Sequence, residues 1–562
     1  IYMHAKHKFF LENEKLEKEG MVSQDIQTID EQFTFDGKQN KTYTLEKIVS
    51  IYTSKDQDTS DAEKDGRDAL VDSGRYAELF ETRKEAWAGL WEKADFVIDG
   101  DRFSQKVVRL HIYHLLVTAS PHNKQIDAGL PARGLHGEAY RGHIFWDELF
   151  MLPFYNTHFP EIAKADLLYR YKRLDAAREY ARNNDYKGAM FPWQTADDGR
   201  EETQEIHYNP VSGEWDPDLS RLQRHVSIAI ASNILDYCRM TNDKEFMRNF
   251  GAEMMFEISR FWASIAEYDE NDNKYHIRNV MGPDEFQEKY PGAEQGGIHD
   301  NAYTNIMVSW LLNKVIGYYE KFEDHEISEI TEKISLEKEE IEQWKKIRDN
   351  MFVEISEEGV LAQFKGYFSL KELDWDKYRE KYDNIRRMDR ILKAEDDSPN
   401  KYKVAKQADA LMTFFVLSPK QVKNTLNRMG YEVKDGRKLL EKNYNYYLKR
   451  TSHGSTLSYV VHAALLKYLN QDGYNRWEWF TNALKSDIYD TQGGTTEEGI
   501  HTGVMGGTID IIMQSFAGVE MFNDHFELNP SMPEHWDELR FKIYHRKNCF
   551  QMGPMQCCHP YY

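Results

Sequence analysis

An acidic loop at residues 281–288, MGPDEFQE, contains the residues that point most directly to chemistry. It follows the strand-like segment IRNV and precedes a helix that opens at Asp300-Asn301, so its acidic side chains project from a Gly-Pro turn with Glu285 at the tip. Partial burial against aromatic side chains can hold such a carboxylic acid protonated near neutral pH, which protonation of a leaving group requires. Taken alone, an acidic Gly-Pro loop is more often a solvent-exposed turn.

A second acidic loop, GGTTEEGIHTGVMGG at residues 493–507, combines Glu497, Glu498 and His501 with glycines that let the backbone approach a ligand closely. The backbone amides, the threonine hydroxyls and His501 would suit a phosphate, whereas Glu498 would suit the activation of water. A flexible connection between helices explains the same residues without a ligand.

The segment TSHGSTLS, residues 451–458, places Ser455 and Thr456 directly before an apolar helix. Free amides at the N-terminus of a helix bind anions, and hydroxyl side chains there add further donors. Simple capping of the helix by Ser455 or Thr456 accounts for these residues equally well.

Groups that can hold a sugar stand at the start of two other predicted helices. YRGHIFWDELF (140–150) contains Arg141, Trp146 and Asp147, and KQAD (406–409) contains Lys406 and Gln407. A tryptophan stacks on the apolar face of a sugar ring, while carboxylate and amide groups take its paired hydroxyls. As isolated residues, each is more often explained by packing or capping.

The elements that position these loops are mainly helical. Residues 1 to about 54 contain β-branched, alternating stretches separated by the turn signal Asp36-Gly37, and we expect strands there. From about residue 60, apolar residues recur at spacings of three and four, which predicts helices with one buried face. Many helices joined by long loops suggest an α/α barrel or a helical array, and a barrel brings its loops together at one end. LRFKIYH, beyond residue 528, is strand-like again.

The composition narrows the class of protein. A formal charge of −22 argues against nucleic acid, because binding phosphates of DNA or RNA needs clustered Lys and Arg. Four cysteines are too few for a disulfide framework, and a metal site formed by Cys549, Cys557, Cys558 and His559 is less expected than incidental thiols. We predict no metal and no organic cofactor. Without a long apolar run or a signal-peptide core, the sequence predicts a cytoplasmic protein with no membrane partner.

Seven blocks in order, ARGLHGEAYRGHIFWDELF, FPWQ, VMGPDEF, DNAYTN, KQAD, HGSTLS and EEGIHTGVMGGT, closely resemble the signature blocks of glycoside hydrolase family 65. The match spans roughly residues 45–525. That family comprises inverting phosphorylases of maltose, trehalose, kojibiose, nigerose and related α-glucosides, and some hydrolases. The resemblance implies a mainly α fold with an (α/α)6 barrel, an N-terminal β-sandwich, a C-terminal β module and often a homodimer.

With both β modules truncated in this sequence, we expect four regions along the chain. They are a β-sandwich remnant at 1–58, a helical linker at 59–100, the barrel at 101–527 and the start of a C-terminal β module at 528–562.

The resemblance also implies roles for individual residues. The general acid falls on Glu285, and the phosphate pocket on Ser455, Thr456 and His501. The sugar-holding residues fall on Trp146, Asp147, Lys406 and Gln407. Chemistry and proximity within the motifs add Arg141 and Trp193 to the substrate-binding set. If water is the nucleophile, Glu498 is the candidate base and Glu497 its rival.

The predicted function is an inverting phosphorylase of an α-linked glucose disaccharide or α-glucoside, which uses inorganic phosphate and releases β-glucose 1-phosphate. An inverting α-glucoside hydrolase of the kojibiose or trehalose type is the alternative. A non-catalytic carbohydrate-binding protein is a distant third, because it should lack an acid where Glu285 stands. The motifs fix neither the linkage and acceptor nor the oligomeric state.

Overall fold

The computed structural model describes residues 1–26, 28–134, 137, 139–321, 324–469, 475–492 and 496–555. These form two compact units, one built from residues 1–93 with 125–127, the other from residues 94–124 and the chain from 128 onward. The boundaries of the four expected regions stay predictions.

The first unit contains the predicted strands. β1 pairs antiparallel with both β2 and β5, and β3 pairs with β4. Buried Phe9, Phe10 and Ile48 lie on β1 and β5, and Leu70 of α1 is buried as well. The Asp61 carboxylate caps α1 by accepting from the amides of Glu63 and Lys64. The elements are β1 (Tyr2–Leu11), β2 (Glu14–Leu16), β3 (Met21–Gln24), β4 (Ile29–Gln32), β5 (Tyr43–Tyr52), α1 (Ala62–Asp72) and α2 (Tyr76–Ala94).

Six helices of the second unit form a closed ring, in which each helix contacts the next and the last returns to the first. They are α4 (Glu148–His158), α7 (Val226–Thr241), α10 (Ala302–Tyr319), α15 (Asp409–Val416), α18 (Leu457–Leu465) and α20 (Thr502–Ile511). Residues 302–312 of α10 are buried without interruption, as are residues 148–152 of α4. The expectation of one buried face per helix is therefore wrong for this ring, because an inner helix is covered by neighbours on all sides.

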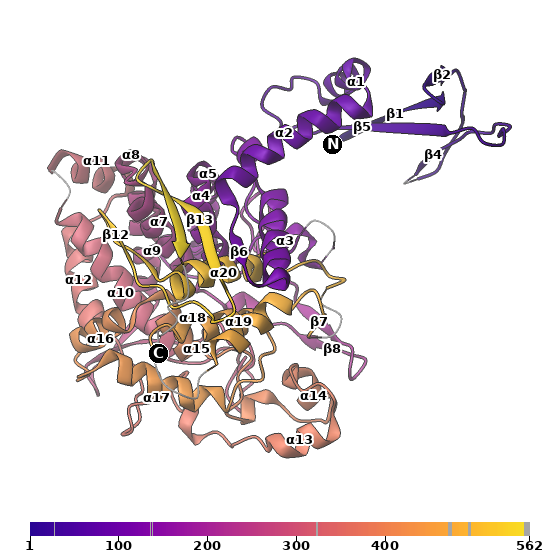
Figure 1. Cartoon of the computed structure of the whole chain (residues 1–562). Coiled ribbons are helices and arrows are strands. Elements are labelled where there is room, and N and C mark those ends of the chain that lie inside the picture. Colours follow the sequence, from indigo (N-terminus) through magenta and orange to yellow (C-terminus); the bar gives the residue numbers. More distant parts are fainter. Residues whose placement is uncertain are drawn as a thin grey trace, which may run out of the picture. The chain divides into compact units, whose positions relative to one another are not determined.

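A second layer of helices packs outside the ring (Figure 1). α3 and α19 contact α20, α5 contacts α4 and α7, α9 and α12 contact α10, and α17 contacts α15. The outer helices are α3 (Arg102–Thr118), α5 (Pro160–Lys172), α9 (Ala252–Ile265), α12 (Lys338–Asn350), α16 (Pro419–Arg428), α17 (Gly436–Leu448) and α19 (Arg476–Lys485). The mainly α fold with an (α/α)6 barrel is confirmed.

The inner helices run in one direction. Residues immediately before α4, α15, α18 and α20 line one cavity, while the last turns of α7, α10, α15, α18 and α20 line another. The N-terminal ends of the ring therefore face the first cavity, and with them the positive ends of the helix dipoles.

An excursion between α12 and α15 carries two short helices, α13 (Trp375–Lys381) and α14 (Met388–Ala394). It has a hydrophobic cluster of its own, into which the acidic loop inserts Phe286. The cluster consists of Phe286, Leu373, Tyr378, Met388, Ile391, Leu392 and Val404.

The strand expected beyond residue 528 is present as β13 (Glu538–His545). It pairs with β14 (Asn548–Met555) on one side and β6 (Val97–Asp99) on the other. Cys557, Cys558 and His559 lie outside the described residues. Among the described residues, no helix has the length and apolar character that crossing a membrane would need.

Candidate active site

A cavity of about 410 Å³ lies at the N-terminal ends of the inner helices. The structure brings eleven residues singled out from the sequence to its wall: Arg141, Trp146, Asp147, Trp193, Glu285, Lys406, Gln407, Ser455, Thr456, Glu498 and His501. Glu497 is exposed and does not line it. A larger cavity, about 1520 Å³, lies at the opposite end and contains none of these residues. The smaller cavity is the candidate site because it holds convergent titratable and aromatic groups.

The acidic loop is held by hydrogen bonds between its backbone and the side chains of Gln407 and Asp409. The amide of Asp284 donates to Asp409 Oδ1 at 2.6 Å, and Gln407 Nε2 donates to the Pro283 carbonyl at 2.8 Å. A Cβ on Gly282 would lie 2.0 Å from Asp409 Oδ2, so only glycine fits there. Glu285 itself has φ +67°, a left-handed backbone that a non-glycine residue adopts at a cost and that gathers at functional sites.

Two buried carboxyls lie beneath Glu285. Burial raises the pKa of Asp409 to about 7, and the nearby Glu285 adds to the shift. Burial and then Asp409 raise the pKa of Asp284 well above its usual range. Gln363 donates to Asp284 Oδ2 at 2.9 Å, and Asn301 donates to Asp409 Oδ2 at 2.5 Å. The pair therefore anchors the loop while holding less than two negative charges near neutral pH.

Glu285 contacts the cation of the KQAD motif. Its Oε2 lies 2.7 Å from Lys406 Nζ, and the two side chains are 29% and 15% exposed. Gln407 is buried beside them, and its Oε1 has no hydrogen-bond partner among the described residues. An unmet buried acceptor on the cavity wall is suited to a sugar hydroxyl.

Aromatic rings form another part of the wall. Trp146 and Trp193 are nearly buried, with ring centroids 6.5 Å apart. The segment that contains Trp146 is fixed by a buried ion pair at the start of α4, in which Arg170 Nε lies 3.0 Å from Glu148 Oε2. The same guanidinium donates to the Phe145 carbonyl at 2.9 Å. The ion pair thus sets the position of Trp146 and of Asp147, which precedes Glu148.

His501 joins the two halves of the cavity wall. Its Nε2 lies 2.7 Å from Asp147 Oδ1, and its Nδ1 lies 2.8 Å from Thr456 Oγ1. Thr456 makes no side-chain capping bond to α18, so capping does not explain it. Ser455 Oγ does accept from the Leu457 amide, at 3.3 Å. The expected sugar and phosphate residues are therefore in direct contact, although Asp147 and His501 are 354 positions apart.

The remaining predicted residues lie at the rim. Glu498 is paired with Arg133 at 3.4 Å, and its side chain is 46% exposed. Arg133 also donates to the Gly499 carbonyl at 3.0 Å. Arg141 is exposed and has a left-handed backbone, with φ +53°.

Sequence reasoning missed a row of cations on the cavity wall. Arg387, Arg390 and Lys393 follow at intervals of three on and just before α14. Arg387 binds Asp389 through two bonds of 3.0 and 2.6 Å; although burial opposes it, this cation lowers the pKa of Asp389 to about 2. The spacing of three in IRRMDRILK is the signal that could have found them.

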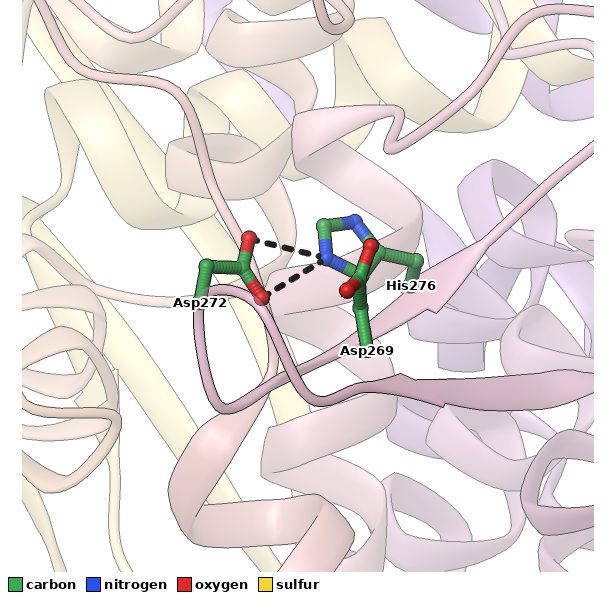
Figure 2. Close-up of side chains that lie close together, drawn as sticks. All are labelled: Asp269, Asp272 and His276. Atoms are coloured by element: carbon green, nitrogen blue, oxygen red, sulfur yellow. Dashed lines mark hydrogen bonds and ion pairs between the residues drawn. The ribbon is translucent and has the colours of Figure 1, made fainter.

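One group of potential metal ligands occurs among the described residues: Asp269, Asp272 and His276, on the hairpin of β9 (Ala266–Asp269) and β10 (Lys274–Ile277). Figure 2 shows one ring nitrogen of His276 facing both oxygens of Asp272, at 3.1 and 3.3 Å. The other nitrogen lies 2.7 Å from Asp300 Oδ2. Both ring nitrogens are thus engaged, and the group does not line the cavity. The absence of a metal stays a prediction.

Three domain families match successive parts of the chain. Residues 109–510 match the glycosyl hydrolase family 65 central catalytic domain, residues 1–90 its N-terminal domain and residues 519–552 its C-terminal domain. The chain belongs to glycosyl hydrolase family 65. A solved structure of a human-microbiome protein has a TM-score of 0.74 at 24% identity, and covers 94% of this chain and 68% of that one, which shows the shared fold.

Several family 65 relatives carry names of activities. The chain is 43% identical over 468 residues to trehalose 6-phosphate phosphorylase of Lactococcus lactis, covering 83% of this chain and 59% of that protein. It is 35% identical over 529 residues to kojibiose phosphorylase of Halothermothrix orenii, covering 90% and 63%. An uncharacterized glycosyl hydrolase of Mycobacterium tuberculosis is 45% identical over 505 residues, covering 90% and 38%. The chain thus spans less than two thirds of the length of these relatives.

Proposed function

We propose that this protein is an inverting phosphorylase that cleaves an α-linked glucose disaccharide or α-glucoside with inorganic phosphate and releases β-glucose 1-phosphate. The observation that carries the proposal is the contact of His501 with both Asp147 and Thr456, at 2.7 and 2.8 Å. It links a carboxylate suited to sugar hydroxyls to a hydroxyl at the start of a helix. The two relatives named as phosphorylases support the same reaction class.

The reaction needs one proton donor from the protein and no protein base. Glu285 gives its proton to the interglycosidic oxygen as the bond from that oxygen to the anomeric carbon breaks. An oxygen of hydrogen phosphate forms the new bond from the opposite face, which inverts the configuration; the phosphate proton is released to solvent, and Glu285 takes up a proton from solvent before the next turnover. In this step Glu285 must leave Lys406, which then turns to the sugar.

Hydrogen-bond donors at the cavity would attract phosphate even though the protein as a whole is negatively charged. The N-terminal ends of α18 and α20 face the cavity, and Ser455, Thr456 and His501 stand at those ends. Helix N-termini and charge-assisted hydrogen bonds both favour a phosphate dianion.

A hydrolase is the second candidate, because Glu498 lines the same cavity. Inverting hydrolysis needs a carboxylate about 6.5–9.5 Å from the acid to activate water. Glu498 is paired with Arg133 at the exposed rim, which holds its carboxylate away from the role of a free base. The presence of Glu285 disfavours a non-catalytic binding protein.

Incubation with a panel of α-linked glucose disaccharides, with and without phosphate, tests the proposal when glucose and glucose 1-phosphate are measured separately. We expect product formation to saturate with phosphate and His501→Ala to raise the KM for phosphate. Full-rate glucose release in phosphate-free buffer, lost in Glu498→Gln, would establish the hydrolase instead.

Glu285→Gln tests the acid. It should lower kcat on an unactivated disaccharide by about 100- to 10,000-fold, because an amide has no proton to give. Activity on α-glucosyl fluoride, whose leaving group needs no proton, should be largely kept and serves as the control for folding. A variant that keeps more than about a tenth of the disaccharide activity would remove Glu285 from this role.

A further inference from the structure

Three cations on one face of the α14 segment reach the cavity, and two of them have a partner. Arg387 is bound to Asp389, and Lys393 Nζ lies 3.4 Å from Glu288 Oε1. The Arg390 guanidinium has no hydrogen bond or ion pair with any residue in the described part of the chain. It lines the cavity and is half-buried.

The surroundings of Arg390 do not compensate its charge. Burial lowers its pKa, and the neighbouring Arg387 lowers it further, whereas Asp389 and Glu498 offset this only in part. A half-buried guanidinium beside a second one is costly unless an anion joins them. In a chain with a net charge of −22, such a cation facing a cavity marks the place of a negatively charged ligand.

The position of these cations relates them to the leaving group. Glu285 lines the same cavity as Arg387 and Arg390, and its neighbour Phe286 packs into the hydrophobic cluster that contains Met388, Ile391 and Leu392 of α14. Because inversion places nucleophile and leaving group on opposite sides of the anomeric carbon, groups near the acid face the leaving group. The donors for the attacking phosphate, His501 and Thr456, come from α18 and α20 instead.

We propose that the part of the substrate released as the leaving alcohol carries a phosphate monoester, and that Arg390 binds it. The inference rests on the proposed function and names its substrate class. A phosphate monoester offers three oxygens to a planar guanidinium, which binds two of them at once. This phosphate takes no part in bond breaking: the same glycosidic bond breaks, and the leaving oxygen receives the proton of Glu285.

The synthetic direction tests the leaving group whatever the linkage of the natural substrate. β-Glucose 1-phosphate is supplied as donor with paired acceptors, namely glucose and glucose 6-phosphate, fructose and fructose 6-phosphate, and glycerol and glycerol 3-phosphate, and released inorganic phosphate is measured. In at least one pair we expect kcat/KM to be about tenfold or more higher for the phosphorylated member. Glucuronate is included as an anionic acceptor without phosphate.

Arg390→Gln should lower kcat/KM for the preferred phosphorylated acceptor about tenfold or more, through KM, while the KM for β-glucose 1-phosphate stays within about twofold. Arg390→Lys should recover part of the loss, because lysine keeps the positive charge but lacks the paired N–H donors of the guanidinium. Arg379→Gln on α13 is the matched control, since Arg379 is exposed, pairs with Asp376 at 3.1 Å, lies 5.8 Å from the Trp375 ring and does not line the cavity. It should leave all acceptors unchanged.

If kcat/KM is the same for the neutral and the phosphorylated acceptor in every pair, the inference is overturned and the proposed function stands. A kcat/KM for glucuronate equal to that for the best phosphorylated acceptor would also overturn it. So would an effect of Arg390→Gln that is confined to the KM for β-glucose 1-phosphate. If no acceptor releases phosphate from the β-anomer, the proposed function falls, and the inference with it.

Discussion

Replacing Asp147 with asparagine should impair the use of phosphate, although Asp147 is the residue expected to hold the sugar. Asp147 Oδ1 accepts from His501 Nε2 at 2.7 Å, and the two side chains are only 8% and 12% exposed. Asp147→Asn removes the charge that orients His501, and with it the orientation of the His501–Thr456 contact. A phosphate site built on His501 then loses its geometry.

The size of the effect follows from one charge-assisted hydrogen bond, about 1.5–3 kcal/mol, which corresponds to roughly 10- to 150-fold. We expect the KM for phosphate to rise by that factor together with a fall in kcat/KM for the glucoside. Steady-state kinetics with each substrate varied in turn measures both. Asp218→Asn is the control, because Asp218 lines the same cavity without contacting His501. If the KM for phosphate is unchanged while only the glucoside is affected, His501 does not connect the two sites.

Two further predictions concern stability. Arg170→Met should destabilise the second unit by about 3–5 kcal/mol, because it leaves Glu148 buried without its cation. In thermal unfolding, the double variant Arg170→Met/Glu148→Leu should recover much of this loss. Equal losses in the single and double variants would contradict the prediction. Burial raises the pKa of Asp409 from 3.8 to about 7, so folding favours the protonated carboxyl. Its contribution to the free energy of unfolding, about 4 kcal/mol, is complete below pH 3.8 and is lost as the pH rises to about 7. Thermal midpoints of wild type and Asp409→Asn between pH 4.5 and 8 should therefore converge or cross as pH rises, and a difference that does not vary with pH would be inconsistent with that shift.

Much of the fold follows from local patterns. Spacings of three and four predicted the helices, and the strands at both ends were found from their composition. The pattern could not show that α10 is covered on every side, because closure of a ring depends on contacts between helices far apart in sequence. The order and direction of the inner helices are likewise a property of the whole barrel.

The candidate site likewise contains residues that the sequence predicts and residues that it does not. Residues next to helix starts, such as Asp147 and Ser455, carry local signals, and a barrel gathers them at one end. Arg390 carries only the spacing of three that it shares with Arg387 and Lys393, and charges at such a spacing are equally typical of an ordinary solvated helix face. Asp284 and Asp409 give no local sign of sharing a buried site, because only the packed structure places them together.

The α13–α14 excursion has its own hydrophobic cluster and supplies Arg387, Arg390 and Lys393 to the cavity wall. Since its stability rests largely on that cluster, substitutions within the excursion can accumulate while the inner helices and their ends remain unchanged. New acceptor preferences can therefore evolve, or be grafted from a relative, by exchange of this one segment. The limit on such exchange is Phe286, because it ties the excursion to Glu285, the proposed general acid.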